Sequence, residues 1–276
     1  MPIAATSQPK SPAPPFYLDV LVELHRVLKP RTYLEVGVQT GKSLAVARCR
    51  ALGVDPDFAV VDELCGEVSL VRTTSDEFFA RENPTAWLGG PVDLAFIDGM
   101  HLFEFALRDF INIEKHSRWS SVIAFDDMLP RNQDEAARNR HTSAWTGDVF
   151  RLVRVLRKYR PDLELIMLDT RPTGLLLVMG LDPTSTVLED HYDEILASTI
   201  KDDPQRVPAR VLGRKGARSA ERVLRSPVWG VLRRGRRFPG GAARGRAQIR
   251  QALSDPQGFR RRRRALSRLV RGRASR

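Results

Sequence analysis

Short apolar runs alternate with amphipathic stretches along the chain from Phe16 to about Leu181. The apolar runs have the length and the β-branched, leucine-rich composition of buried strands, whereas the amphipathic stretches repeat apolar residues at helical spacing. Strands and helices that alternate in this way form a mainly parallel sheet with helices on both faces. The pattern therefore predicts an α/β domain.

The same pattern places the individual elements. It predicts a first helix from Tyr17 to Leu28, and later helices from Leu44 to Arg50 and from Phe150 to Tyr159. The last two strands are separated by a turn-like connection, so we expect them to pair as an antiparallel hairpin. The predicted strands cover residues 32–38, 51–55 (with 58–61 as an alternative), 68–72, 92–97, 121–125, 163–168 and 173–179.

The charge distribution divides the chain into an acidic body and a basic end. Residues 201–276 hold 24 of the 45 Lys and Arg residues but only 4 of the 33 Asp and Glu residues. We expect residues 1–15 to be a disordered, Pro-rich lead-in and residues 16–200 to form the domain. Residues 201–276 are expected to be an Arg-rich tail that is largely disordered or forms short amphipathic helices.

The basic tail also carries apolar residues at helical spacing. A segment of this composition suits an anionic membrane surface, and it would also attract nucleic acid by counterion release. The membrane is the partner that we favour. The apolar residues are Val228, Trp229, Val231, Leu232 and Phe238, followed later by Leu266, Leu269 and Val270.

Cysteine usage and the absence of apolar signals indicate a cellular compartment. Cys49 and Cys65 are too few for a secreted disulfide framework. No apolar run reaches the length of a membrane span, and the N-terminus lacks the order of a signal peptide. We expect a cytoplasmic protein that is peripheral at the inner membrane face if its tail binds lipid.

Three aspartates follow two of the predicted strands. Asp98 ends one apolar run, and Asp126 and Asp127 end the next. If these strands are parallel neighbours, about 4.8 Å apart, the three carboxylates converge at one edge of the sheet. Carboxylates without a cation would repel one another, and hard oxygen ligands suit Mg²⁺. We therefore expect all three to bind Mg²⁺.

The position of Asp127 depends on a local break in the strand. Successive strand residues point to opposite faces, so Asp126 and Asp127 can both bind one ion only if the strand ends there. The following Met-Leu-Pro130 makes such a break plausible. The alternative for Asp127 is a helix cap or an ion pair with an arginine such as Arg108.

His101, three residues beyond Asp98, adds a candidate base at the same edge. An imidazole near its ordinary pKa can take a proton from a hydroxyl group at neutral pH. A structural role is the alternative, but the neighbouring carboxylates favour a catalytic one.

A glycine turn follows the first strand, in Glu35-Val-Gly37-Val-Gln-Thr-Gly41-Lys-Ser43. Glycines at such a turn let the backbone approach a ligand closely, and the acidic residue suits a cationic or zwitterionic ligand better than a pyrophosphate. The pattern resembles the S-adenosylmethionine (SAM) site of class I methyltransferases. The resemblance implies a Rossmann-like fold and the cofactor-binding residues Glu35, Gly37, Gln39, Gly41, Ser43, Asp55, Ser75, Asp76 and Asp98.

A narrower resemblance concerns the three aspartates. Asp98, Asp126 and Asp127 match, in order and strand context, the metal carboxylates of macrocin-type sugar O-methyltransferases. The segment from Asp98 to His101 looks like the motif whose histidine is proposed to deprotonate the sugar hydroxyl. The resemblance covers about residues 16–181. It implies SAM and Mg²⁺ as cofactors and a small-molecule, glycan or glycolipid acceptor, and it is compatible with a homo-oligomer.

The loop from Pro130 to Trp145 is rich in Arg and Asn and is expected to cover the acceptor as a lid. Arg131, Asn132 and Trp145 are then the candidate substrate contacts. Asp148, at the start of the following helix, is expected to cap it.

These observations together predict a SAM-dependent O-methyltransferase with a Rossmann-like sheet of seven strands, mostly parallel, whose last strand is antiparallel. The acceptor is expected to be a hydroxyl of a sugar, a glycoconjugate or another polar natural product. Two alternatives stay open. One is an RNA- or DNA-directed methyltransferase that uses the basic tail, and the other is a non-catalytic SAM-fold module tethered to a membrane or polyanion.

Overall fold

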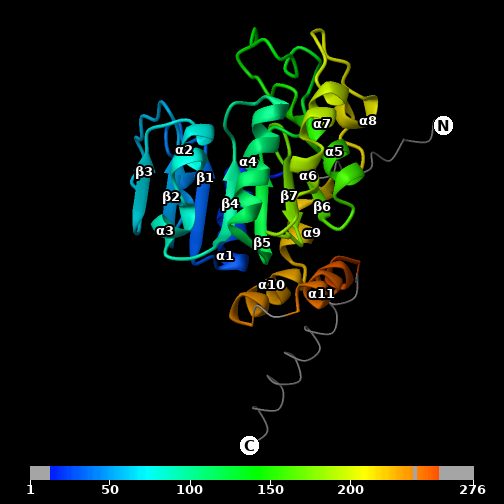
Figure 1. The fold of residues 1–276 in the computed structure, drawn as a ribbon. Coiled ribbons are helices and arrows are strands. Elements are labelled where there is room, and N and C mark those ends of the chain that lie inside the picture. Colours follow the sequence, from blue (N-terminus) through cyan, green and yellow to red (C-terminus); the bar gives the residue numbers. More distant parts are fainter. Residues whose placement is uncertain (1–12, 239–240, 255–276) are drawn as a thin grey trace, which may run out of the picture.

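The computed structural model describes residues 13–238 and 241–254. An eight-stranded sheet runs through the molecule in the order β3-β2-β1-β4-β5-β7-β6-β8, with helices on both faces (Figure 1). Only β7 is antiparallel to its neighbours β5 and β6. The strands are β1 (Thr32–Val36), β2 (Arg50–Val54), β3 (Val68–Val71), β4 (Val92–Ile97), β5 (Ser117–Phe125), β6 (Glu164–Asp169), β7 (Leu175–Met179) and β8 (Arg218–Ser219).

The sheet confirms the predicted Rossmann-like methyltransferase fold, including the antiparallel hairpin of β6 and β7. The eighth strand was not predicted, because its two residues, Arg218 and Ser219, are too few to give a pattern. The first strand ends two residues earlier than predicted since Gly37 has φ +86°, outside the range of a strand. Gly174, with φ +72°, likewise delays the start of β7.

The helices are as follows. The N-terminal half of the chain forms α1 (Tyr17–Leu28), the 3₁₀ turn η1 (Leu44–Val46), α2 (Ser75–Arg81), α3 (Pro84–Leu88) and α4 (Phe103–Lys115). The C-terminal half forms η2 (Val149–Arg151), α5 (Leu152–Tyr159), α6 (Val187–Asp190), α7 (Tyr192–Thr199), α8 (Ala209–Leu212), α9 (Ala220–Leu224), α10 (Val228–Arg237) and α11 (Ala242–Ser254).

The predicted helix from Leu44 to Arg50 is wrong, since only one 3₁₀ turn forms there. The strand β2 already begins at Arg50, which leaves too few residues for a longer helix between the glycine turn and the sheet. Phe150 to Tyr159 is helical as predicted, although its first turn is the 3₁₀ turn η2.

Two apolar cores lie on the two faces of the sheet. One face packs against α4, α5 and α7, with Phe103, Phe110 and Leu156 fully buried. The other packs against α1, α10 and α11, with Leu24 and Trp229 buried. A sheet that is covered on both faces has strands that are buried along their length, and every position of β4 and all but Arg118 of β5 are buried.

The described part of the basic C-terminal segment packs on the sheet. Trp229 and Leu232 of α10 are buried, and Gly235 lies against the ring of Trp119, where an added Cβ would come within 2.3 Å of the ring. Val228, Trp229, Val231 and Leu232, which the sequence offered to a membrane, are therefore internal, whereas Phe238 is 69% exposed. Leu266, Leu269 and Val270 lie outside the described residues.

Arg236 shows how this segment is fastened. Its guanidinium is buried and donates to Asp93 Oδ2 at 3.1 Å, to the carbonyl oxygen of Lys29 at 2.7 Å and to that of Leu28. Asp93 also accepts from the Arg31 side chain at 3.1 Å. One arginine of the expected solvated run is thus a buried structural cation at the amino end of β4.

Several predictions fall outside the described residues. They concern most of the Pro-rich lead-in (residues 1–12) and the last part of the tail (residues 255–276), which includes the arginine run after residue 259. Within residues 13–238 and 241–254, no helix combines the length and the apolar character that a membrane crossing requires.

Candidate functional site

The ends of β4 and β5 bring the predicted carboxylates together. The two strands are parallel neighbours, with Ile97 opposite Phe125, and the N–H of Asp126 donates to the Ile97 carbonyl at 3.1 Å. Asp98 and Asp126 therefore leave the sheet side by side. This arrangement follows from the predicted strand order.

The strand β5 ends just before Asp126, as the prediction that Asp126 and Asp127 lie at one site required. The strand β5 ends at Phe125, and Asp127 has φ +62°, the left-handed conformation. Asp126 helps to hold this turn, because its Oδ1 accepts from the Asp127 N–H at 2.8 Å. The turn brings the side chain of Asp127 to the same edge as Asp98.

His101 lies between two of these carboxylates. Its Nδ1 is 2.9 Å from Asp127 Oδ2 and its Nε2 is 3.3 Å from Asp98 Oδ1. Nδ1 is also 2.9 Å from the backbone oxygen of Trp145, whose ring stacks on the imidazole at a centroid distance of 5.2 Å. The imidazole is therefore fixed on both of its nitrogens and on one face.

The backbone of His101 is equally constrained. The residue has φ +57°, and Gly147 packs directly on its carbonyl oxygen, where an added Cβ would come within 1.7 Å. Only glycine fits this contact, since Gly147 itself has φ +57°. The contact between Gly147 and the His101 carbonyl therefore holds the segment that contains Trp145 against the loop that contains His101.

Among the described residues, no guanidinium forms an ion pair with the carboxylates at this edge. Burial raises the pKa of Asp126 well above its ordinary value, and the charges of Asp98 and Asp127 raise it further. Burial also raises the pKa of Asp98. Burial lowers the pKa of His101, but its hydrogen bonds to Asp127 and Asp98 outweigh this and leave the pKa well above the ordinary value. An imidazolium thus offsets part of the negative charge.

One set of side chains has the spacing of a metal site. Asp98, His101 and Asp127 each offer one ligand atom, and these atoms lie within 4.8 Å of one another. Asp126 lines the same narrow cavity, of about 10 Å³, but its Oδ1 is engaged by the Asp127 N–H and lies 3.5 Å from Thr173 Oγ1. His101 thus joins Asp98 and Asp127 in this set, and the metal-binding role of Asp126 stays a prediction.

The glycine turn lies against this edge. An added Cβ at Gly37 would come within 2.0 Å of the Asp98 carbonyl oxygen, and Gly41, with φ +82°, would meet the side chain of Val60. Asp55 Oδ2 accepts from the N–H groups of Val38 and Gln39 at 2.7 and 2.8 Å. The acidic residue after β2 therefore holds the turn that follows β1, so the turn, Asp55 and Asp98 form one continuous surface.

Glu35 and Ser43 lie beneath the turn, away from its surface. Glu35 is fully buried and accepts hydrogen bonds from the hydroxyls of Tyr33 at 2.5 Å and Ser43 at 2.8 Å. Burial raises its pKa to about 8, even though these hydrogen bonds act in the opposite direction. In this structure Glu35 and Ser43 support the glycine turn from the interior of the protein.

Ser75 and Asp76 open α2 and contact α4. Asp76 forms a two-pronged ion pair with Arg108, at 2.6 and 2.8 Å. Ser75 hydrogen-bonds to Asp109, a buried residue that lines the same narrow cavity as Asp98 and whose pKa burial raises to about 7. The arginine that the sequence offered to Asp127 therefore pairs with Asp76.

The lid residues are mostly engaged within their own loop. Arg131 pairs with Glu135 at 2.5 Å, and Asn132 Oδ1 accepts from the Glu135 N–H at 2.8 Å. Trp145 is the predicted substrate residue that reaches the site, by stacking on His101. Arg131 and Asn132 instead shape the loop.

Asp148 does not cap the helix that follows it, contrary to the prediction. Its Oδ1 accepts from the N–H of Phe103, the first residue of α4, at 2.8 Å. Its Oδ2 accepts from Arg138, which also pairs with Glu104. Asp148 thus fastens the lid to the start of α4, a contact across 45 residues that no local pattern shows.

Two residues that sequence reasoning missed lie close to the carboxylates. The side chain of Tyr17, from α1, has its pKa raised by burial and then by the charges of Asp98 and Asp126. Thr173, from the turn between β6 and β7, approaches Asp126. Neither stands at the end of a parallel strand, so the rule that found the aspartates could not find them.

A comparison with protein families identifies the domain that carries this site. Residues 34–128, from β1 to the residue after Asp127, match the model of a methyltransferase-domain family. This segment of the chain is a methyltransferase domain. The matched segment of the methyltransferase includes the glycine turn, Asp55, Asp98 and His101. None of the curated proteins compared matches the chain.

Solved structures of methyltransferases show a similar arrangement at low identity. The O-methyltransferase TomG from Streptomyces achromogenes, involved in tomaymycin synthesis and solved with SAM, is 18% identical over 59% of this chain and 78% of its own, with a TM-score of 0.44. A putative O-methyltransferase from Klebsiella pneumoniae is 16% identical over 62% and 82%, also at 0.44. The methyltransferase MycE of the mycinamycin pathway, solved with Mg and SAH, is 20% identical over 59% and 48%, at 0.42. These values do not bear on the substrate of this chain.

Proposed function

We propose that this methyltransferase transfers the methyl group of SAM to a hydroxyl oxygen of a sugar, a glycoconjugate or another polar small molecule. The observation that supports this most directly is His101, held by Asp98 and Asp127 at the carboxyl edge of the sheet. An oxygen acceptor must lose its proton, and a fixed imidazole in this position can receive it. Transfer to an already nucleophilic acceptor would not need such a group.

The proposed cofactor site is the surface formed by the glycine turn, Asp55 and Asp98. The zwitterionic methionine part of SAM would lie over Gly37, Gln39 and Gly41. Asp55 Oδ2 already accepts from two backbone N–H groups, whereas Oδ1 accepts from the Asp57 N–H alone and retains a lone pair for a ribose hydroxyl. Ser75 and Asp76, at the start of α2, would border the adenine. Glu35 and Ser43 would support the turn from below.

The reaction itself is a displacement in line with the bond between sulfur and the methyl carbon. The acceptor oxygen forms the new bond to the methyl carbon, the carbon–sulfur bond breaks, and S-adenosylhomocysteine leaves with the electron pair. The hydroxyl proton passes to the His101 imidazole. Trp145 covers one face of this imidazole and keeps water from it.

The acidic set fits a divalent cation. Asp98 and Asp127, with Asp126 beside them, would hold it, and their carboxylate oxygens are the ligands that Mg²⁺ prefers. When bound, Mg²⁺ would supply positive charge that lowers the pKa of the acceptor hydroxyl and offsets the carboxylates that hold a proton on His101. His101 would then be free to act as the base.

The test of this function uses the full chain, methyl-labelled SAM and fractionated cell extract, with and without a chelator. We expect label in a glycan, glycolipid or other hydroxyl-bearing small molecule. The label should disappear with chelator, return with added Mg²⁺, and be lost in His101→Ala. His191→Ala is the matched control, because His191 is exposed on the segment between α6 and α7.

Three results would contradict parts of the proposal. If chelator does not change the labelling, the reaction needs no divalent cation, and only the proposed role of His101 as the base remains. Labelled RNA or DNA would replace the proposed acceptor class. An Asp98→Ala variant that labels extract as well as the wild-type protein would remove the site altogether.

A further inference from the structure

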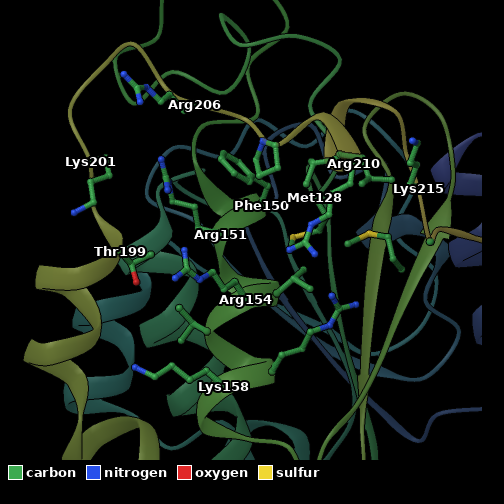
Figure 2. A pocket seen from close by; sticks show the side chains of 18 of the residues that line it. Met128, Phe150, Arg151, Arg154, Lys158, Thr199, Lys201, Arg206, Arg210 and Lys215 are labelled. Carbon is green, nitrogen blue, oxygen red and sulfur yellow. The ribbon is translucent and has the colours of Figure 1, made fainter.

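A second cavity adjoins the proposed methyl-transfer site and has no role in the reaction described above. It has a volume of about 430 Å³ and is enclosed by α5, β6 and the segment from α7 to just beyond α8 (Figure 2). This volume lies in the range of small-molecule sites. Its position and size call for a ligand.

The lining of this cavity is strongly cationic. It includes eight Lys and Arg side chains and no Asp or Glu. Arg151 has Gln205 and Asp148 as neighbours, and Lys158 lies 3.5 Å from Glu194. Among the described residues, no carboxylate comes within 4.0 Å of the other six, which are Arg154, Arg157, Lys201, Arg206, Arg210 and Lys215.

Three arginines elsewhere in the molecule have carboxylate partners instead. Arg108, Arg138 and Arg160 all pair with carboxylates at 2.6 to 2.8 Å. Like charges gathered around a concavity repel one another and raise the local concentration of anions. The cavity is therefore built to receive negative charge from outside the chain.

The floor of the cavity is apolar. Met128, Leu129, Phe150 and Val155 are buried beneath the cationic rim. Figure 2 shows Phe150 and Met128 among the labelled basic side chains. A ligand that suits both surfaces has an anionic group and an apolar or planar part. Phosphate esters of small organic molecules have this character, and arginines bind phosphate oxygens in pairs.

The cavity and the carboxylate site lie on successive residues of two segments. Asp127 lines the narrow carboxylate cavity and Met128 lines the basic one. Likewise, Val149 lines the carboxylate cavity and the next residue, Phe150, lines the basic one. The basic cavity and the carboxylate cavity are therefore neighbours along both segments.

The outer wall of the cavity is fastened to the lid. Gln205, which is buried, accepts from Arg151 of η2 and donates to Asp203 Oδ1 at 3.0 Å. Asp203 in turn accepts from the N–H groups of Arg138 and Asn139 at 3.0 Å each. The segment that supplies Lys201 and Arg206 is thus held in place by the same loop that places Trp145 over His101.

We propose that this basic cavity binds a phosphorylated small molecule and that this molecule is the methyl acceptor, held by its phosphate or diphosphate group. The second half of the proposal rests on the proposed function, whereas the first half does not. A nucleic acid would need an extended basic face, and the cations here are gathered within one concavity.

Binding to the full chain can be measured by calorimetry with two probes, inorganic pyrophosphate and UDP-glucose. The test variant is Arg154→Gln/Arg210→Gln. The control is Arg81→Gln/Arg234→Gln, which removes the same charge from exposed arginines on α2 and α10. We expect both probes to bind the wild-type protein and the control equally, and the test variant about tenfold or more weakly. SAM affinity should not change in any of them.

Further arms of the experiment separate the sources of the phosphate. Phosphatidylcholine vesicles doped with phosphatidic acid replace the soluble probes in one arm. Binding to these vesicles alone, lost in the test variant and kept in the control, would support the cavity and assign a lipid phosphate. An RNA oligonucleotide that binds more tightly than the soluble probes, and is weakened equally by both double variants, would overturn the proposal.

Two remaining outcomes separate this inference from the proposed function. If no phosphorylated probe distinguishes the test variant from the control, the proposal that the cavity binds phosphate is wrong. The proposed methyl transfer at His101 is not affected by that result. If the probes and SAM bind normally but no hydroxyl acceptor is methylated, the cavity still binds phosphate. The proposal that its ligand is the methyl acceptor is then wrong.

Discussion

A carboxylate lies at each end of β4, and the two differ in their surroundings: Asp93 is buried, whereas the Asp98 side chain, just beyond the strand, is 25% exposed. At the amino end, Asp93 accepts from the guanidinium groups of Arg31 and Arg236, each at 3.1 Å. At the carboxyl end, Asp98 lies beside Asp126 and Asp127 and has only the imidazole of His101 as a cationic neighbour among the described residues.

The different partners of Asp93 and Asp98 indicate different roles for the two charges. A guanidinium is always protonated and fixes its partner permanently, so Asp93 serves the fold. An imidazole can give up its proton, so the negative charge around Asp98 is available to a cation or to a reacting hydroxyl. Sites that keep charge unbalanced in this way lose stability for the sake of activity.

The largest expected effect follows from removing the functional charge. Asp98→Asn should reduce methyl transfer by about 100-fold or more, because the residue positions His101 and offers a ligand oxygen. The melting temperature should stay unchanged or rise, since a mutual repulsion is removed. Labelled-SAM transfer and thermal unfolding measure the two effects. A large fall in melting temperature would mean that Asp98 is structural like Asp93.

Removing the structural charge should have the opposite result. Arg236→Met should destabilise the fold by about 3–5 kcal/mol, because it leaves Asp93 and two backbone carbonyls with fewer donors in a buried place. Activity per folded molecule should persist. Denaturant unfolding measures the loss, and Asp93→Asn in the same chain should recover part of it. A variant as stable as the wild-type protein would show that the pair is dispensable.

Glu35 is a buried acid beside the functional end, and pH tests its state. Its pKa in the folded protein is about 8, above the ordinary 4.5, so the folded state keeps a proton that the unfolded chain has lost. Stability should therefore fall as pH rises from about 4.5 to about 8, by about 1.4 kcal/mol per pH unit from this group. Glu35→Gln should remove that part of the slope, whereas the exposed Glu63→Gln should not. Equal slopes in both variants would contradict a buried, protonated Glu35.

The smallest expected effect concerns the second partner of Asp93. The Arg31 side chain is 60% exposed, so its ion pair is weakened by solvent. Arg31→Gln should cost less than about 1 kcal/mol in denaturant unfolding. A loss as large as that of Arg236→Met would mean that exposure does not distinguish the two arginines.

The sequence predicted most of the functional end and little of the structural end. Asp98, Asp126 and Asp127 were found because carboxyl ends of parallel strands meet at one edge, a rule that needs only the strand order. The same rule says nothing about the φ +62° of Asp127, on which its approach to His101 depends. It also gives no sign that Trp145 would stack on the imidazole.

The ion pair of Asp93 and Arg236 spans 143 residues and has no local signal. The apolar positions around Trp229 fit an amphipathic helix against a membrane as well as one against a sheet, and only the tertiary contact with Trp119 decides between them. The basic cavity is similar, because its cations come from separate segments that no motif links.

The buried arginine of α10 also sets a lower limit to the size of the folding unit. A fragment that stopped at residue 200 would lose Arg236 and uncover Trp119, so it would fail to fold or would aggregate for reasons unrelated to its chemistry. Recombinant proteins meant to separate the catalytic part from the arginine-rich end should therefore retain the chain through α11, at Ser254, and be trimmed only beyond it.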